Sequence, residues 1–134
     1  MVKIMRKVIL LMLLSVVSSN AMAEWVKVRI SDDGNATAYV DPSTMLKDGS
    51  NVKMWALLDF RVAKTTGGET YLSTKQQNEF DCKKTKIRLL TFSLYSGNMG
   101  NGNVVYESPN IGNWDMFFQG GLGEAFWKIA CGKK

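Results

Sequence analysis

The chain has 134 residues, with 17 basic and 12 acidic side chains, a net charge of +5, two cysteines and no histidine. The lack of histidine excludes Ser-His and Cys-His nucleophilic catalysis and histidine metal sites, and two thiols are too few for a cysteine-only zinc site. We therefore expect a non-enzymatic protein that uses no metal and no cofactor.

The N-terminus has the pattern of a secretory signal peptide. A basic stretch at residues 3–7 precedes an almost unbroken apolar run at residues 8–17, and Ala21 and Ala23 have the A-x-A spacing that signal peptidase reads. The apolar run is too short to span a bilayer comfortably, and no cysteine follows it that could carry a lipid anchor. We predict cleavage after Ala23, with an uncleaved N-terminal anchor as the alternative.

Cleavage divides the chain into a signal peptide, residues 1–23, and one mature domain, residues 24–134. Three basic residues and no acidic one lie in the signal peptide, which leaves 14 basic against 12 acidic residues and a net charge of +2. This charge is too mild to indicate nucleic-acid binding, and the mature domain contains no segment that would integrate into a membrane. We expect an exported protein that is either periplasmic or secreted to the cell surface.

The mature chain reads as short strands separated by turns rich in glycine, asparagine and aspartate. Alternating apolar and polar residues predict strands at residues 24–30, 36–41, 52–63, 70–80, 86–95 and 104–108. In the first of these, Val26, Val28 and Ile30 are expected to share one face. Asp41-Pro42 predicts that the chain leaves the sheet in a turn or a single helical turn, and Gly67-Gly68 predicts a hairpin.

The last segment, residues 122–132, predicts a helix. Leu122, Phe126 and Ile129/Ala130 fall on one face at helical spacing. Because a short helix is marginal on its own, this face must pack on the sheet. The predicted fold class is α+β: an antiparallel meander of about six strands with one C-terminal helix packed on it.

The two cysteines of an exported protein predict one disulfide, here between a turn of the sheet (Cys82) and the end of the helix (Cys131). A crosslink of about 50 residues is worth roughly 4 kcal/mol in the chain-entropy model. The lysines beside Cys82 could instead indicate a reactive thiolate. An exported reactive thiol would soon be oxidised, however, and Cys131 would lack a partner.

Two clusters are candidates for binding a partner. Lys84, Lys86 and Arg88 would project to one face of a regular strand, with Lys75 beside them on the neighbouring strand. They form either a solvated outer face or a positive patch for acidic or sulfated partners.

The second cluster is aromatic and follows the last strand. Trp114, Phe117 and Phe118 lie in the connection to the helix. They either cap the core or form a partly exposed contact surface.

The segments "YVDPSTM" and "MWALLDF", together with the paired Cys82 and Cys131, make the mature chain resemble the surface-adhesin protein E family. The resemblance implies a small sheet of about six antiparallel strands with a C-terminal helix bonded to it by the disulfide. It also implies adhesion to extracellular-matrix and serum glycoproteins, a tendency to form homodimers, and a binding region that maps to Tyr71–Cys82. Of the basic positions in that region, only Lys75 is shared.

We therefore expect an exported binding protein that recognises a protein or glycan partner through a sheet face with a basic strand. The alternative is a soluble periplasmic module, or an inhibitor of an enzyme acting in the envelope, with no host ligand. The two differ in where the protein is found, because an adhesin must reach the outer surface.

Overall fold

A computed structural model describes residues 23–134 of the chain. The predicted signal peptide, apart from Ala23, lies outside the described residues. No helix in the described part of the chain is long and apolar enough to cross a membrane.

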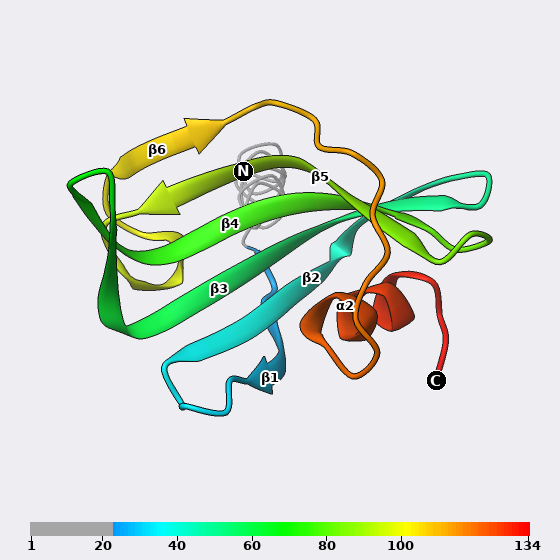
Figure 1. Cartoon of the computed structure of the whole chain (residues 1–134), viewed down its shortest axis with the longest axis horizontal. Helices are drawn as coiled ribbons and strands as arrows, with labels where there is room; N and C mark the ends of the chain where they lie inside the picture. Colours follow the sequence, from blue (N-terminus) through cyan, green and yellow to red (C-terminus); the bar gives the residue numbers. More distant parts are fainter. Residues whose placement is uncertain (1–22) are drawn as a thin grey trace, which may run out of the picture.

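Six strands form one antiparallel sheet in chain order, as Figure 1 shows. They are β1 (Val26–Ile30), β2 (Ala36–Asp48), β3 (Asn51–Thr66), β4 (Glu69–Asp81), β5 (Lys86–Tyr95) and β6 (Val104–Ser108). A short 3-10 helix, η1 (Asn98–Gly100), lies between β5 and β6, and the helix α2 (Leu122–Ala130) follows β6. This arrangement confirms the predicted fold class.

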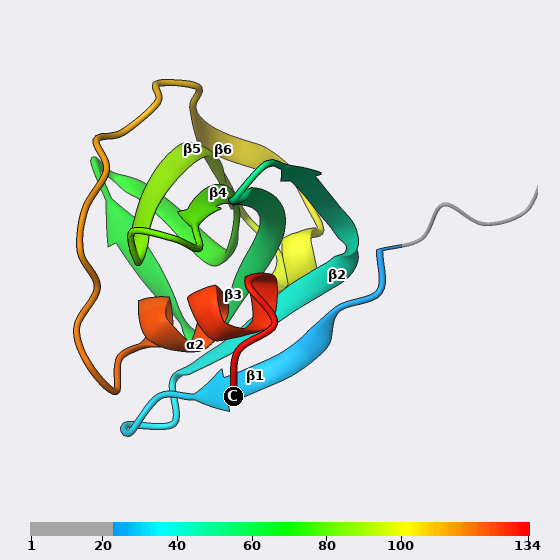
Figure 2. The same cartoon turned by 90° about the vertical axis from the view of Figure 1, so that its right-hand side faces the viewer.

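The core lies between α2 and one face of the sheet, which we call the helix face. Buried Val52 and Met54 of β3 and Phe80 of β4 meet Phe126 and Ala130 of α2. In Figure 1 the helix lies in front of the sheet, and Figure 2 shows the same packing after a 90° rotation. The opposite face, called the open face here, carries alternate residues of the same strands, and α2 does not pack against it.

The predicted helix face packs on the sheet through Leu122, Phe126 and Ala130, but its remaining member does not. Ile129 is exposed, whereas Trp127 is buried. The indole Nε1 of Trp127 donates a hydrogen bond to the carbonyl of Asp81 at 3.0 Å. This bond ties the helix to the β4–β5 turn and rotates Ile129 toward solvent. Beyond the helix, Gly132 adopts the left-handed conformation (φ +65°) that often ends a helix.

The Cys82–Cys131 disulfide is confirmed, with the two Cα atoms 5.5 Å apart. It joins the end of α2 to the turn between β4 and β5. The Cys82 backbone N–H also donates to the carbonyl of Ser50 in the β2–β3 turn, at 2.9 Å. Two hairpin turns and the helix end are therefore held together at one end of the molecule.

Two strands depart from the sequence prediction. β2 does not end at Asp41: pairing with β3 stops after Asp41 and resumes at Leu46. The intervening residues form a bulge in which Ser43 and Thr44 bond back to Asp41, so Pro42 sits where a strand tolerates it.

The strand β1 also differs, because the register shifts between Lys27 and Arg29 and leaves Val28 as the extra residue. The bulge breaks the alternation. Val28 packs on the core, while Val26 and Ile30 are exposed. The Gly67-Gly68 hairpin is confirmed, and both glycines have the positive φ that a tight turn of this kind requires.

Candidate functional site

The predicted basic row is divided between a turn and a strand. Lys84 lies in the β4–β5 turn and not on β5, because Asp81 Oδ1 accepts hydrogen bonds from the backbone N–H groups of Lys83 and Lys84. Thr85 then adopts a positive φ of 53° before β5 begins at Lys86. Lys84 is therefore exposed at the tip of a hairpin, outside β5, and the prediction that it shares a strand face with Lys86 is wrong.

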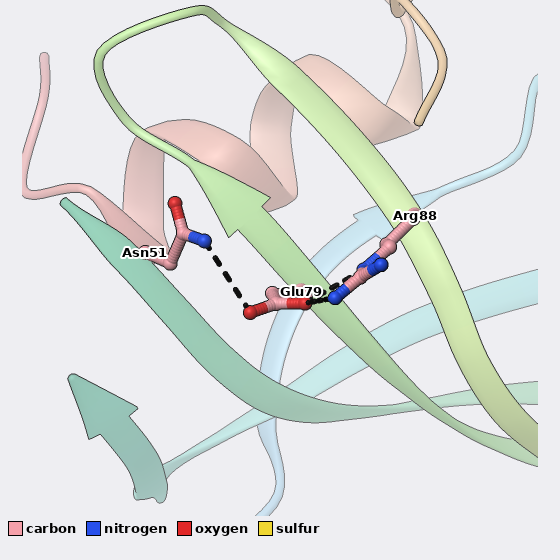
Figure 3. A network of polar contacts seen from close by, with 3 residues as sticks. All are labelled: Asn51, Glu79 and Arg88. Carbon is pink, nitrogen blue, oxygen red and sulfur yellow. Dashed lines mark hydrogen bonds and ion pairs between the residues drawn. The ribbon is translucent and has the colours of Figure 1, made fainter. Parts of the chain in front are cut away.

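Arg88 is paired with an acidic residue of the neighbouring strand, as Figure 3 shows. Its Nε donates to Glu79 Oε1 at 2.7 Å, and its Nη2 forms an ion pair with the same oxygen. Glu79 is 93% buried, and Asn51 Nδ2 lies 3.5 Å from its other oxygen. On the other side, the guanidinium carbon lies 4.6 Å from the ring centre of Trp114, a cation–π distance. Glu79 therefore neutralises the charge of Arg88 and Trp114 stacks on its guanidinium, so Arg88 contributes little to a positive surface patch.

The three aromatic residues of the connection have different roles. Figure 2 shows this connection running from β6 past β5 to α2. Trp114 stacks on Arg88, and Phe117 packs against Trp127 with ring centres 5.6 Å apart. Phe118 is 90% exposed. Core capping thus describes Phe117, while Phe118 projects into solvent, and the three do not form one surface.

Lys75 lies in a groove on the open face. The cavity has a volume of about 430 Å³. Its lining comes from the start of the described chain and from strands β2 to β6: Ala23, Trp25, Asp41, Thr44, Trp55, Lys75, Thr91, Ser93, Tyr95 and Glu107. The ammonium of Lys75 lies 5.1 Å from the ring centre of Tyr95. We call this cavity the open-face groove.

Strand register builds the groove. Trp55 pairs with Asp41, Lys75 pairs with Ser93, and Ser93 pairs with Glu107 on its other side. Directly paired residues of an antiparallel sheet point to the same face, so these side chains gather although they are far apart in the sequence.

The β5–β6 loop packs against the side chain of Lys75. Ser73 Oγ donates to the carbonyl of Gly97 at 2.6 Å and accepts from the N–H of Gly100 at 2.8 Å. The side chain of Lys75 lies so close to Gly100 that a β-carbon there would collide with it. The loop therefore positions the groove lysine.

The groove offers flat apolar rings beside polar groups. Trp25, Trp55 and Tyr95 supply the rings. Lys75 is the one basic lining residue, and Asp41 and Glu107 are the acidic ones. Such a lining suits a ligand with both apolar faces and hydrogen-bonding groups, such as a sugar ring or a peptide segment. No cluster of three or more metal-ligating side chains occurs in residues 23–134.

Two carboxyl groups have a shifted pKa, and neither lines the groove. A hydrogen bond from Ser31 lowers the pKa of Asp33, and a hydrogen bond from Lys128 lowers that of Glu124. Asp33 lies in a surface turn and Glu124 lies in the first turn of α2. Both pKa shifts therefore come from hydrogen bonds to nearby residues and do not mark a site.

A second, larger cleft of about 620 Å³ lies near the β3–β4 hairpin. It is lined by Thr66, Gly67, Glu69, Tyr71, Phe92, Leu94 and Tyr106. Only Tyr71 belongs to the predicted binding region, and none of the candidate side chains lies there.

Comparison with known proteins identifies the fold independently of the site. Three solved structures of Haemophilus influenzae protein E resemble the chain. Crystal form II is 14% identical with a TM-score of 0.63, and the match covers 79% of this chain and 87% of that one. A further structure is 13% identical with a TM-score of 0.63, covering 86% and 90% of the two chains, and the protein from a non-typeable strain is 13% identical with a TM-score of 0.56, covering 84% and 80%. No curated protein sequence matches the chain significantly. The profile of a family described as surface-adhesin protein E matches residues 25–132. The chain therefore belongs to the surface-adhesin protein E family.

Proposed function

We propose that this protein is an exported, non-enzymatic adhesin-like protein that binds a protein or glycan partner through the open-face groove. The observation that carries the proposal is the groove itself, in which Trp55 and Lys75 stand among hydroxyl groups. Family membership supports an adhesin-like role, and the resemblance implies a binding region at Tyr71–Cys82, a segment that contains Lys75.

Basic side chains near one end of the open face support a contact surface larger than the groove alone. Lys86 and Arg88 alternate with Ile87, which packs on the helix-face core, so both basic residues belong to the open face. Arg88 is paired with Glu79, whereas no ion pair of Lys84 or Lys86 occurs among residues 23–134. We propose the groove as the anchor and these two lysines as a rim that steers acidic partners.

Binding by matched variants tests this arrangement. The mature, oxidised protein would be measured on surfaces coated with heparin or with extracellular-matrix glycoproteins. Trp55→Ala and Lys75→Gln are expected to weaken binding at least ~10-fold, as central anchor residues do. Lys84→Gln/Lys86→Gln should change mainly the association rate and its salt dependence. Lys64→Gln, beside the β3–β4 turn, removes the same charge away from the groove and serves as the control.

Each alternative gives a different result. If the groove variants bind like the wild type while the Lys84/Lys86 variant does not, recognition belongs to the basic rim and the groove assignment is wrong. If none of the variants changes binding, the open face is not the recognition surface.

Cell fractionation tests the location. An adhesin must be accessible at the outer surface, so a protein found only in the periplasm would contradict this role and favour a periplasmic module. Size-exclusion chromatography of the mature protein would test the homodimer that the family resemblance implies.

A further inference from the structure

The carboxylate of Asp41 is buried beside the groove and has no cationic partner in the described residues. Asp41 is only 2% exposed. Its Oδ1 accepts from the backbone N–H and the hydroxyl of Ser43, at 3.1 and 2.5 Å. Its Oδ2 accepts from the backbone nitrogen of Glu24 at 3.1 Å. The ion pairs among residues 23–134 are Arg88–Glu79 and Lys128–Glu124, and neither involves Asp41.

Lys75 is the one cation that lines the same groove, yet it does not serve as the counter-ion. Its ammonium lies over the ring of Tyr95, and it forms no ion pair with Asp41. The other charged lining residue, Glu107, is acidic. A buried carboxylate bonded only to neutral donors is unfavourable, because burial removes its hydration and supplies no opposite charge.

The sequence points independently to the atom that Asp41 contacts. The A-x-A spacing of Ala21 and Ala23 predicts cleavage after Ala23. Cleavage at that bond would turn the nitrogen of Glu24 from a peptide amide into an α-ammonium group. The atom already within hydrogen-bond distance of Asp41 would then carry a positive charge and three protons.

We propose that the α-ammonium group of Glu24, released by signal-peptide cleavage, is the counter-ion of Asp41 and completes the open-face groove. The inference rests on the proposed export and cleavage of the chain. A charged hydrogen bond of this kind is about twice as strong as a neutral one. Because Ala23 itself lines the groove, its removal also takes away part of the lining and widens the groove.

A double cycle of stability measurements tests the ion pair without any partner. The mature oxidised chain that begins at Glu24 is compared with the same chain carrying an acetyl group on the Glu24 nitrogen, each with Asp41 or with Asp41→Asn. Acetylation keeps one N–H donor and removes the charge. We expect it to lower Tm by ~4–8 °C when Asp41 is present, and by much less in the Asp41→Asn background. Equal losses in the two backgrounds, or no loss in either, overturn the proposal.

A second measurement covers the case in which Asp41→Asn fails to fold. Reductive methylation followed by peptide mapping reports the accessibility of each amine. The Glu24 amine is expected to react at least ~10-fold more slowly in the folded protein than in urea, since an ion-paired amine is a poorer nucleophile. The exposed Lys134 should react at similar rates in both conditions. Equal folded and unfolded rates for Glu24 would contradict the pairing.

The outcome is separable from that of the proposed function. Mass spectrometry of the exported protein identifies its first residue, and any residue other than Glu24 overturns the inference while leaving the groove experiment intact. Conversely, loss of partner binding in the groove variants says nothing about the stability cycle, which contains no partner.

Discussion

Replacing Arg88 by methionine should destabilise the protein more than a surface charge change would. The substitution leaves Glu79, which is 93% buried, without its charged partner. Breaking a buried pair from one side costs about 3–5 kcal/mol. The side chain of Arg88 is 30% exposed, so water can reach the carboxylate, and we expect a loss of about 2–3 kcal/mol in the free energy of unfolding. That is a large share of the roughly 5–15 kcal/mol typical of a domain.

Urea denaturation of the mature, oxidised protein measures this loss. Glu79→Met combined with Arg88→Met should recover most of the stability, because an apolar pair of similar volume often replaces a buried ion pair without penalty. Lys86→Met, on the same strand face, is the control and should stay within about 0.5 kcal/mol of the wild type. If Arg88→Met costs no more than Lys86→Met, Arg88 behaves as a free surface cation and the reasoning is wrong.

Three further predictions follow from the structure. Replacing Cys82 and Cys131 by serine should lower the free energy of unfolding by about 4 kcal/mol, measured by urea denaturation against the oxidised wild type. The hydrogen bond from the lysine one turn later lowers the pKa of Glu124 below its ordinary value of 4.5. The stabilisation that Glu124 provides is therefore complete above pH 4.5 and is lost as the pH falls through the lowered pKa. In thermal denaturation, the Tm of Glu124→Gln should accordingly be lower than that of the wild type at neutral pH, and the two Tm values should converge in acid. Gly100→Ala should displace the groove lysine and strain a φ of +72°, weakening partner binding and costing about 1 kcal/mol or more.

Local patterns predicted the fold because strand alternation and turn residues agree along most of the chain. β5 and β6 begin and end where their alternation does, and a glycine pair marks the β3–β4 hairpin. The error at Pro42 has a physical cause. A proline and an aspartate signal an interruption of pairing, but they do not reveal whether the chain returns to the same neighbour. Here β2 resumes pairing at Leu46.

The periodicity of α2 correctly predicted that Leu122, Phe126 and Ala130 face the sheet, but it could not decide which residue completes this face. Phe126 and Ala130 belong to a stripe that can be completed by Ile129 on one side or by Trp127 on the other. The indole hydrogen bond to Asp81 decides between them, and it joins residues 46 positions apart. The spacing of apolar residues within the helix carries no information about a contact with so distant a residue.

The site was only partly predictable for a similar reason. The Glu79–Arg88 pair could have been found, since a tight hairpin that pairs Asp81 with Lys86 also pairs Glu79 with Arg88. The groove could not, because Trp55 and Lys75 meet only through the register of β2 to β6. The Lys84 error arose from extending the strand into a turn that Asp81 fixes by hydrogen bonds.

We propose that the helix face provides stability and the open face provides recognition, and neighbouring residues of β3 can test this. Met54 is fully buried under α2, whereas Trp55 is half-buried in the groove. Met54→Ala should cost about 2–5 kcal/mol, as core truncations do, and should spare partner binding at temperatures where the variant is folded.

Trp55→Ala should do the reverse: it removes a groove ring but leaves the helix-face core and the disulfide intact. Urea denaturation and partner binding would be measured on both variants. If Trp55→Ala unfolds as easily as Met54→Ala, the tryptophan is a second core residue, and a loss of binding in that variant could not be assigned to the groove. Only a loss of binding at nearly unchanged stability would place recognition on the open face.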